Sequence, residues 1–202
     1  IGRSAGQFSQ KTYATAIGYY AGHLSQSDYA VSIGYLAGNA CQKQYATAIG
    51  YQAGQTSQSE YSIAIGRYAG STCQKQLAVA IGDNAGVTSQ SEYAVALGFS
   101  AGQTCQKSYA IAIGNSAGQT SQSSYAIAIG NSAGSSGAQG SNAIAIGNLA
   151  GQTSQNNASI IVNATGGALN SAQNSACYIA PLRVDNGDTN CVIYNNTTKE
   201  LS

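Results

Sequence analysis

The stretch YATAIGYQAGQTSQSE, residues 45–60, is one copy of a sixteen-residue unit that recurs about ten times up to about residue 157. A short, fixed period is typical of a repeat protein, in which each unit packs on its neighbours and lacks a core of its own. Two glycines hold the same two places in each unit. Because glycine takes positive φ without steric cost, they predict two turns per repeat. The turn glycines of the central repeats are Gly18, Gly22, Gly34, Gly38, Gly50, Gly54, Gly66, Gly70, Gly82 and Gly86.

Between these turns runs a segment with the period of a β-strand. Tyr13, Thr15 and Ile17 alternate with two alanines, so the larger side chains share one face and the alanines the other. No helical period survives such glycine spacing, and the sole proline, Pro181, lies outside the array. We therefore expect an all-β fold, a β-solenoid of about ten coils, with two strands of about four or five residues per coil and about 4.8 Å between coils.

The recurring AIG and AG signatures resemble a known family. The strings YATAIGYYAG (13–22), YSIAIGRYAG (61–70) and NAIAIGNLAG (142–151) are similar to the head repeats of trimeric autotransporter adhesins. This resemblance implies a left-handed parallel β-roll shared by three chains, intertwined or side by side. It agrees with the expectation that a thin single rod buries too little apolar surface to stand alone. The coils of that family are typically shorter, so longer outer turns are implied here.

The last 45 residues, 158–202, have a different character, and we expect them to form a transition segment and short β cap after a shaft at residues 1–157. Residues 178–183 (YIAPLR) and 194–201 (YNNTTKEL) resemble the segment that precedes the self-cleaving intramolecular chaperone of phage tail spikes and large-virus fibre proteins. That resemblance implies that Ser202 is the cleavage junction. The alternative is that the chain ends there for an unrelated reason.

The few charged residues follow a period of two repeats, and we call them the charge ladder. Lysines occur in alternate repeats, and acids occupy the neighbouring column in the repeats between them. Stacking the coils would interleave the two signs and keep like charges two layers apart, which favours a role in register, with receptor binding as the alternative. The ladder consists of Lys11, Asp28, Lys43, Glu60, Lys75, Glu92 and Lys107.

The cysteines also alternate. Cys41, Cys73 and Cys105 stand two coils apart, about 9.6 Å, which is too far for a disulfide within one rod. We interpret them as small apolar filler, with bonds between chains as the alternative. Cys177 and Cys191 could pair with each other or remain thiols. There is no zinc-type spacing and no expected metal or cofactor.

Tyrosines form two further columns. One holds Tyr13 and its equivalents and is most simply explained by cross-strand stacking. The other lies in a turn of the N-terminal half and is a candidate surface for a host glycan or protein receptor. It contains Tyr19, Tyr20, Tyr35, Tyr51 and Tyr68. Glutamine also recurs in every unit, as stacked amide ladders do in parallel β structures.

Several classes of function are disfavoured. The net charge is +1 with only eight Lys and Arg, so a nucleic-acid partner is not expected. No apolar run is long enough for membrane insertion. The one histidine, His23, sits at a variable turn position, and acids occur singly, so no catalytic constellation is expected.

The sequence thus predicts a structural fibre or host-attachment protein, a rigid homotrimeric rod on a virus or phage particle. Its expected location is extracellular or on the virion surface. The alternatives are a self-assembling extracellular or cell-surface filament and a bacterial adhesin. A regular threonine column, which includes Thr56, Thr72 and Thr88, leaves ice binding as a further, weaker alternative.

Overall fold

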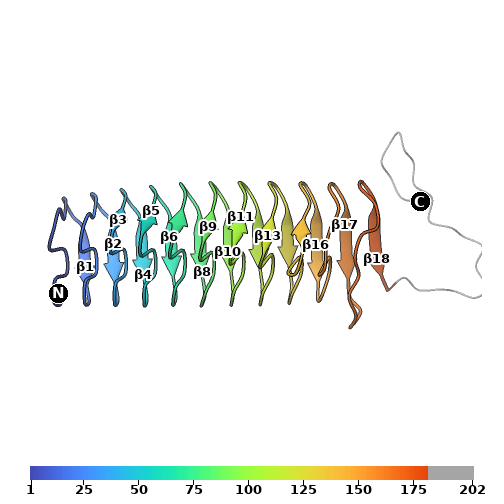
Figure 1. Cartoon of the computed structure of the whole chain (residues 1–202), viewed down its shortest axis with the longest axis horizontal. Coiled ribbons are helices and arrows are strands. Elements are labelled where there is room, and N and C mark those ends of the chain that lie inside the picture. Colours follow the sequence, from blue (N-terminus) through green and yellow to red (C-terminus); the bar gives the residue numbers. More distant parts are fainter. Residues whose placement is uncertain (182–202) are drawn as a thin grey trace, which may run out of the picture.

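The computed structural model describes residues 1–181, and in this part the chain forms a straight rod of stacked coils without a helix (Figure 1). The coils form two parallel sheets, and the central coils contribute a strand to each of them. The strands of the eleven-stranded sheet are β1 (Thr15–Ile17), β2 (Val31–Ile33), β4 (Thr47–Ile49), β6 (Ile63–Ile65), β8 (Val79–Ile81), β10 (Val95–Leu97), β12 (Ile111–Ile113), β14 (Ile127–Ile129), β16 (Ile144–Gly147), β17 (Ile160–Asn163) and β18 (Cys177–Ala180). Those of the seven-stranded sheet are β3 (Cys41–Gln42), β5 (Ser57–Gln58), β7 (Cys73–Gln74), β9 (Ser89–Gln90), β11 (Cys105–Gln106), β13 (Ser121–Gln122) and β15 (Ala138–Gln139).

The register of both sheets repeats the sequence period. Ile63 pairs with Val79 and Gln58 pairs with Gln74, each sixteen residues further on, and every pair of strands is parallel. The prediction of a parallel β-solenoid is confirmed. The strands are shorter than predicted, with three residues in a typical strand of the larger sheet and two in the smaller. Turns occupy the remainder of each coil.

The tyrosine that precedes each strand of the larger sheet belongs to a turn, and its predicted place on the strand face is wrong. Tyr61 has a φ of 58°, and the turn is closed by the amide of Ser62, which donates to the carbonyl oxygen of Ser59 at 3.3 Å. A left-handed backbone at a bulky residue is uncommon. The strand length predicted from the alternation of large and small residues is therefore too long, because it includes this turn.

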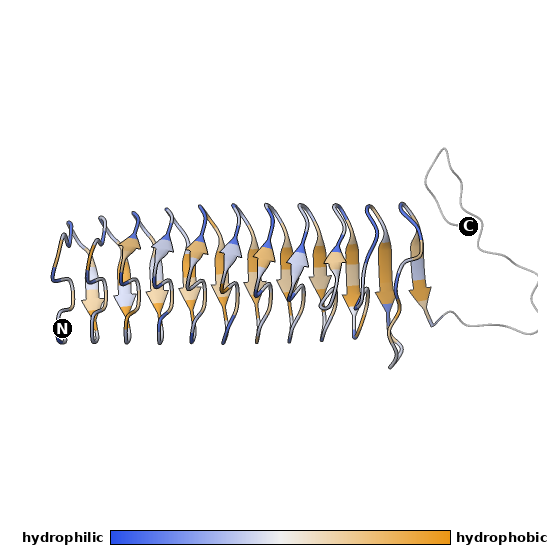
Figure 2. Ribbon diagram, viewed as in Figure 1, coloured by the Kyte–Doolittle hydropathy of each residue, from blue (hydrophilic) through white to orange (hydrophobic). Residues whose placement is uncertain are grey.

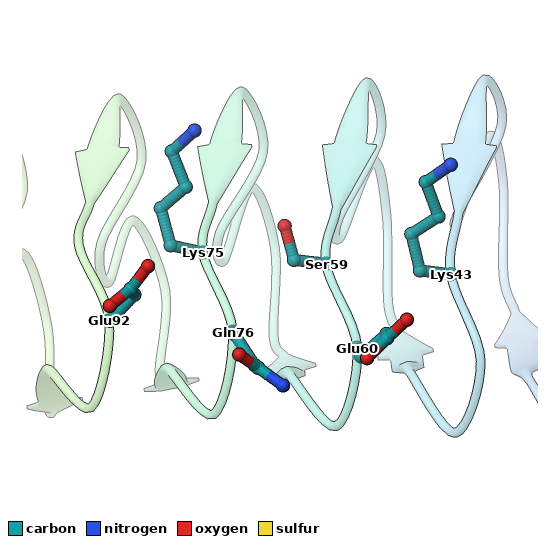
Figure 3. Close-up of a pocket in the computed structure, with 6 residues that line it drawn as sticks. All are labelled: Lys43, Ser59, Glu60, Lys75, Gln76 and Glu92. Carbon is teal, nitrogen blue, oxygen red and sulfur yellow. The ribbon is translucent and has the colours of Figure 1, made fainter.

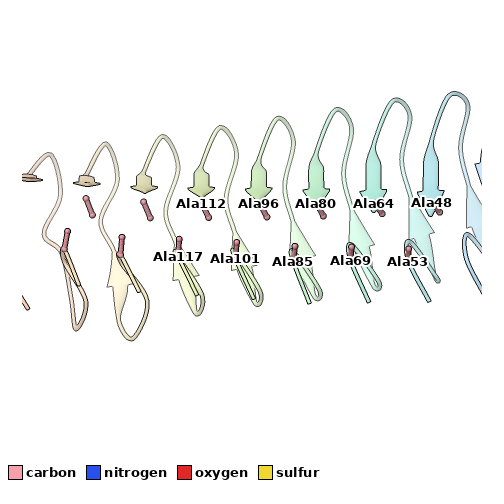
Figure 4. Close-up of a cluster of buried hydrophobic side chains, with 14 of the residues drawn as sticks. Ala48, Ala53, Ala64, Ala69, Ala80, Ala85, Ala96, Ala101, Ala112 and Ala117 are labelled. Atoms are coloured by element: carbon pink, nitrogen blue, oxygen red, sulfur yellow. The ribbon is translucent and has the colours of Figure 1, made fainter. Parts of the chain in front are cut away.

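The interior of the rod is lined by alanine, as the small face of the repeat predicts. Ala48 and Ala64 on the larger sheet and Ala53 and Ala69 from the turns have no solvent exposure and form two facing columns (Figure 4). The apolar side chains that flank the buried alanine, such as Ile63 and Ile65 in β6, point outward and stay partly exposed. The core of the rod is therefore packed with its smallest side chains, while the larger aliphatic side chains of these strands point outward.

A column of glutamines fills the other half of the interior. Gln74 is 1% exposed, and its Nε2 donates to the carbonyl oxygens of Ile63 at 2.7 Å and Ala78 at 3.2 Å. The same Nε2 lies 3.1 Å from Oε1 of Gln90 in the next coil. Equivalent bonds join Gln42 to Gln58, Gln58 to Gln74, Gln90 to Gln106, Gln106 to Gln122 and Gln139 to Gln155. The predicted amide ladder is therefore present, and it satisfies buried backbone carbonyl groups as well as itself.

One extra residue interrupts this ladder. Gln122 and Gln139 are seventeen residues apart, and no bond joins their amides; Oε1 of Gln139 is buried without a partner. The strands on either side still pair in order, Ile127 with Ile144. The turn around Ser135–Gly137 thus absorbs the insertion, at the cost of one contact in the amide ladder.

The larger sheet runs on beyond residue 157. Strand β17 pairs with β16 and β18 pairs with β17, and Ile161 takes the buried place that Ala145 holds in the preceding coil. The predicted boundary at residue 157 stays a prediction. Residues 182–202 lie outside the described residues, and so does the expected junction at Ser202. The possible pairing of Cys177 with Cys191 is untested for the same reason, because Cys191 belongs to that segment.

The two glycine columns are tight for different reasons. Gly66 has a φ of +128°, and a Cβ on it would lie 2.5 Å from the carbonyl oxygen of Gly82 in the next coil. Gly70 has a φ of +52°, and a Cβ there would lie 2.7 Å from Oε1 of Gln74. The first column lets backbones stack, and the second leaves room for the buried amide.

Replacing Gly66 by alanine should therefore lower the free energy of unfolding by at least about 3 kcal/mol, because the backbone is strained and the new methyl group meets a carbonyl oxygen that cannot move away. Urea unfolding at one fixed protein concentration measures the change. In the control Gly166→Ala nothing lies within 4 Å of the new Cβ, and the change should stay within about 0.5 kcal/mol. Equal stability of the two variants would contradict this assignment of the turn.

Replacing Gln74 by leucine tests the amide ladder. The change leaves the carbonyl oxygens of Ile63 and Ala78 and one neighbouring amide oxygen without a donor, so we expect a loss of about 2 to 4 kcal/mol in unfolding free energy. The matched control is Gln76→Leu in the same coil, where the side chain is exposed. If both variants melted like the parent protein, the buried amide would have no stabilising role.

Candidate functional site

Three surfaces of the rod carry the chemistry that a partner could contact. They are the charge ladder, the tyrosine columns and the apolar face of the larger sheet. Each is a column, because a residue type at one position of the repeat is brought into line with its equivalents in the neighbouring coils.

The charge ladder lies beside the seven-stranded sheet, and four of its members surround an open hollow of about 400 Å³. Lys43 and Lys75 rise from coils two apart, with Ser59 and Glu60 in the coil between them and Glu92 in the coil beyond Lys75 (Figure 3). Gln76 completes the lining. The signs interleave along the axis, as the two-repeat period predicts.

These ladder residues do not form ion pairs with one another. Within residues 1–181 the one ion pair is Arg67 with Asp83, which lies in a turn elsewhere. Asp28 is held by the backbone, since its Oδ1 accepts from the amide of Thr12 at 3.1 Å. The lysine ammonium groups are therefore solvated and available, and a register role for the ladder stays a prediction.

The Arg67–Asp83 pair was missed by sequence reasoning. Nη2 and Nε of Arg67 lie 2.8 and 3.1 Å from Oδ2 of Asp83, and this hydrogen bond, together with the charge of Asp83, raises the pKa of the guanidinium. The signal was available: the two residues are sixteen positions apart and so occupy one column. Exposed pairs of this kind contribute little to stability.

The turn tyrosines form a stack along the rod. The rings of Tyr19 and Tyr35 are 5.2 Å apart at 6°, and those of Tyr35 and Tyr51 are 5.0 Å apart at 7°. Tyr68 meets Tyr51 edge-on at 5.4 Å, and Tyr20 lies edge-on to Tyr19. Desolvation beside these neighbours, then the charge of Tyr68, raises the pKa of Tyr51. Stacking hides the ring faces, so the surface offers mainly ring edges and hydroxyl groups.

The second tyrosine column, the tyrosine rail, stacks as the sequence predicts. Its ring centroids are 4.8 to 5.1 Å apart between neighbours, and Leu77 divides it into two runs. The rail comprises Tyr13, Tyr29, Tyr45, Tyr61, Tyr93, Tyr109 and Tyr125. It borders the acidic column of the charge ladder in sequence.

The remaining candidates have simpler places. Cys41, Cys73 and Cys105 are exposed, so their interpretation as apolar filler is wrong; they alternate with serine on the outward side of the seven-stranded sheet. His23 packs against Phe8 and Tyr20 and contacts Oε1 of Gln7 through Nε2 at 3.2 Å. In the described part of the chain, no three metal-ligating side chains cluster and no helix is long and apolar enough to span a membrane.

The threonine column uses its hydroxyl groups internally. Oγ1 of Thr72 donates to the carbonyl oxygen of Val87, and Oγ1 of Thr104 to that of Gln119, at 2.6 and 2.7 Å. Such hydroxyl groups are committed to the next coil. This reduces what the column can offer to ice.

The apolar face is the outward side of the larger sheet, and its side chains are aliphatic or threonine without a charge. Figure 2 shows the strands of this sheet as a row of hydrophobic segments along the rod. The face comprises Thr15, Ile17, Val31, Ile33, Thr47, Ile49, Ile63, Ile65, Val79, Ile81, Val95, Leu97, Ile111, Ile113, Ile127, Ile129, Ile144 and Ile146. Most are half-buried, and Ile17, Leu97 and Ile146 are about 40% exposed.

Comparison with known proteins agrees with this geometry. Residues 42–69 match the model of the YadA head domain repeat, in two copies. No curated protein and no solved structure matches the chain. Together with the parallel solenoid described above, this match fits a β-roll like that of trimeric autotransporter adhesin heads.

Proposed function

We propose that this chain is the shaft of a rigid homotrimeric surface fibre with an attachment function. The observation that carries the proposal is the uncharged apolar face of the larger sheet, which runs the length of the rod and which a single chain leaves partly exposed. Large exposed apolar patches mark sites of association. The match to an adhesin head repeat supports the same assembly and a location on a surface outside the cell.

The small side chains of the core explain why the rod needs the apolar face for its stability. A coil whose interior consists of alanine and glutamine buries little aliphatic area, because its isoleucines and valines point outward. Association of three rods through those side chains would move them out of water, at about 25 cal/mol for each Å² of apolar surface removed. Rod and trimer would then share one hydrophobic core.

The kind of fibre to which the chain belongs is a second part of the proposal. We place the fibre on a virus or phage particle, with residues 1–157 as the shaft, residues 158–202 as the cap, and Ser202 as the junction left by a self-cleaving chaperone. What supports this is the resemblance of residues 178–183 and 194–201 to the segment before such chaperones. The second candidate, a bacterial surface adhesin, is favoured by the YadA head repeat. The gene sequence beyond Ser202 separates them: a chaperone domain supports the virion fibre, and a coiled-coil stalk with a membrane anchor supports the adhesin.

Sedimentation equilibrium should return a mass three times the chain mass of 20.4 kDa. The double variant Ile65→Lys/Ile113→Lys should dissociate or lose at least tenfold in association constant, because two charges per chain would be buried in an apolar interface. The control Gln76→Lys adds its charge in the exposed turn after β7, outside the apolar face, and should remain trimeric. A monomeric parent protein at micromolar concentration would contradict the proposal.

A further inference from the structure

The outward side of the seven-stranded sheet and the turn that follows each of its strands repeat their chemistry every two coils. Coils of one kind present a cysteine and a lysine, such as Cys73 and Lys75, and coils of the other kind present two serines followed by an acid, such as Ser57, Ser59 and Glu60. Coils stand about 4.8 Å apart, so an ammonium group recurs about every 9.6 Å. The ladder from Lys11 to Lys107 therefore contains four equally spaced cations.

These cations make no ion pair with the described part of the rod. No carboxylate of residues 1–181 lies within ion-pair distance of any of the ladder lysines, which leaves Lys43 and Lys75 pointing to the same side of the hollow with the hydroxyl of Ser59 between them. The hollow is open and extends over four coils, from Lys43 to Glu92. A ligand that fits it is long, thin and polar, and lies along the rod axis.

The spacing restricts the class of ligand. In an extended β-strand, side chains on one face recur about every 6.7 Å, so a bound strand would lose register with the lysines after one contact. In a polyproline II peptide, side chains on one face recur about every 9.3 Å, which is close to the lysine spacing. Such peptides dock on open aromatic faces, however, and stacking hides the ring faces of the neighbouring tyrosine rail. An extended, β-linked polysaccharide repeats once per disaccharide, a length close to two coils.

We propose that the charge ladder is a binding track for a linear acidic polysaccharide that carries one carboxylate per disaccharide, such as alternating uronic acid and N-acetylhexosamine. The carboxylates lie at Lys11, Lys43, Lys75 and Lys107. The acetamido N–H groups of the intervening sugars donate to the carboxylates of Glu60 and Glu92, and Ser59 and Gln76 bind sugar hydroxyl groups. The acids in the ladder thus select against polymers with a carboxylate on every sugar.

The proposed track gives the attachment function a ligand class, and this inference rests on that proposed function. The ladder residues lie in the turns that lead from the smaller sheet to the larger one and are not part of the apolar face, so assembly through that face need not cover the track. In a trimer each chain would carry one track.

The experiment uses the whole chain, with its trimeric mass checked first, and hyaluronan oligosaccharides as probes in isothermal titration calorimetry at low salt. Affinity should rise from the tetrasaccharide to the octasaccharide, because four lysines are spaced for four disaccharides. Lys75→Gln should weaken octasaccharide binding about two- to fivefold, as expected for loss of one exposed charge contact. Arg67→Gln removes an equal charge outside the track and should leave binding unchanged.

A rearranged variant tests the spacing separately from the charge. Ser59→Lys/Lys75→Ser keeps composition and net charge but moves one cation by one coil, and it should lose at least fivefold in affinity while its circular dichroism and trimer mass stay the same. Equal binding by the rearranged variant would reduce the track to general charge attraction. No hyaluronan binding by the intact trimer, tighter binding of polygalacturonate, or preference for an acidic polyproline II peptide would each overturn the proposal. A monomeric mass would instead count against the proposed fibre.

Discussion

The hydrogen bonds of the buried glutamine amide are the interaction on which the rest of the rod depends. Gln74 lies on the smaller sheet, yet its Nε2 reaches the carbonyl oxygen of Ile63 on the larger sheet and that of Ala78 in the turn between them. It therefore ties the two sheets together across an interior too narrow for large apolar side chains. Because an unmade bond of this kind is costly in a buried place, the amide also fixes the position of each coil along the axis.

Fixed coils turn every position of the repeat into a column, and the surface chemistry of the molecule follows from that. Tyrosines stack on tyrosines, threonine hydroxyl groups bond to the next coil, and cations recur at a constant interval. The same geometry places the aliphatic side chains of the larger sheet in one continuous face. A rod of this design presents extended, periodic surfaces in place of a deep pocket, which suits partners that are themselves long or repeated.

Much of this could be predicted because the repeat amplifies weak local signals. Gly66 and its equivalents predicted the turns, and the recurring glutamine predicted the amide ladder. The errors have physical reasons. Tyr61 alternates in size with its neighbours as a strand residue would. Its backbone is nevertheless left-handed, because the coil turns at this residue, and the sequence pattern does not show that turn. Cys73 was interpreted as small apolar filler, but it is exposed, because the smaller sheet gives its inward place to Gln74.

Hydrogen exchange of the glutamine side-chain amides, followed by nuclear magnetic resonance, tests the central claim most directly. The Nε2 protons of the ladder from Gln42 to Gln122 should exchange as slowly as the backbone amides of the larger sheet, since both open only when coils separate. Side-chain amides on the surface, such as that of Gln76, should exchange freely. Rapid exchange of the ladder amides in an otherwise protected rod would contradict the account.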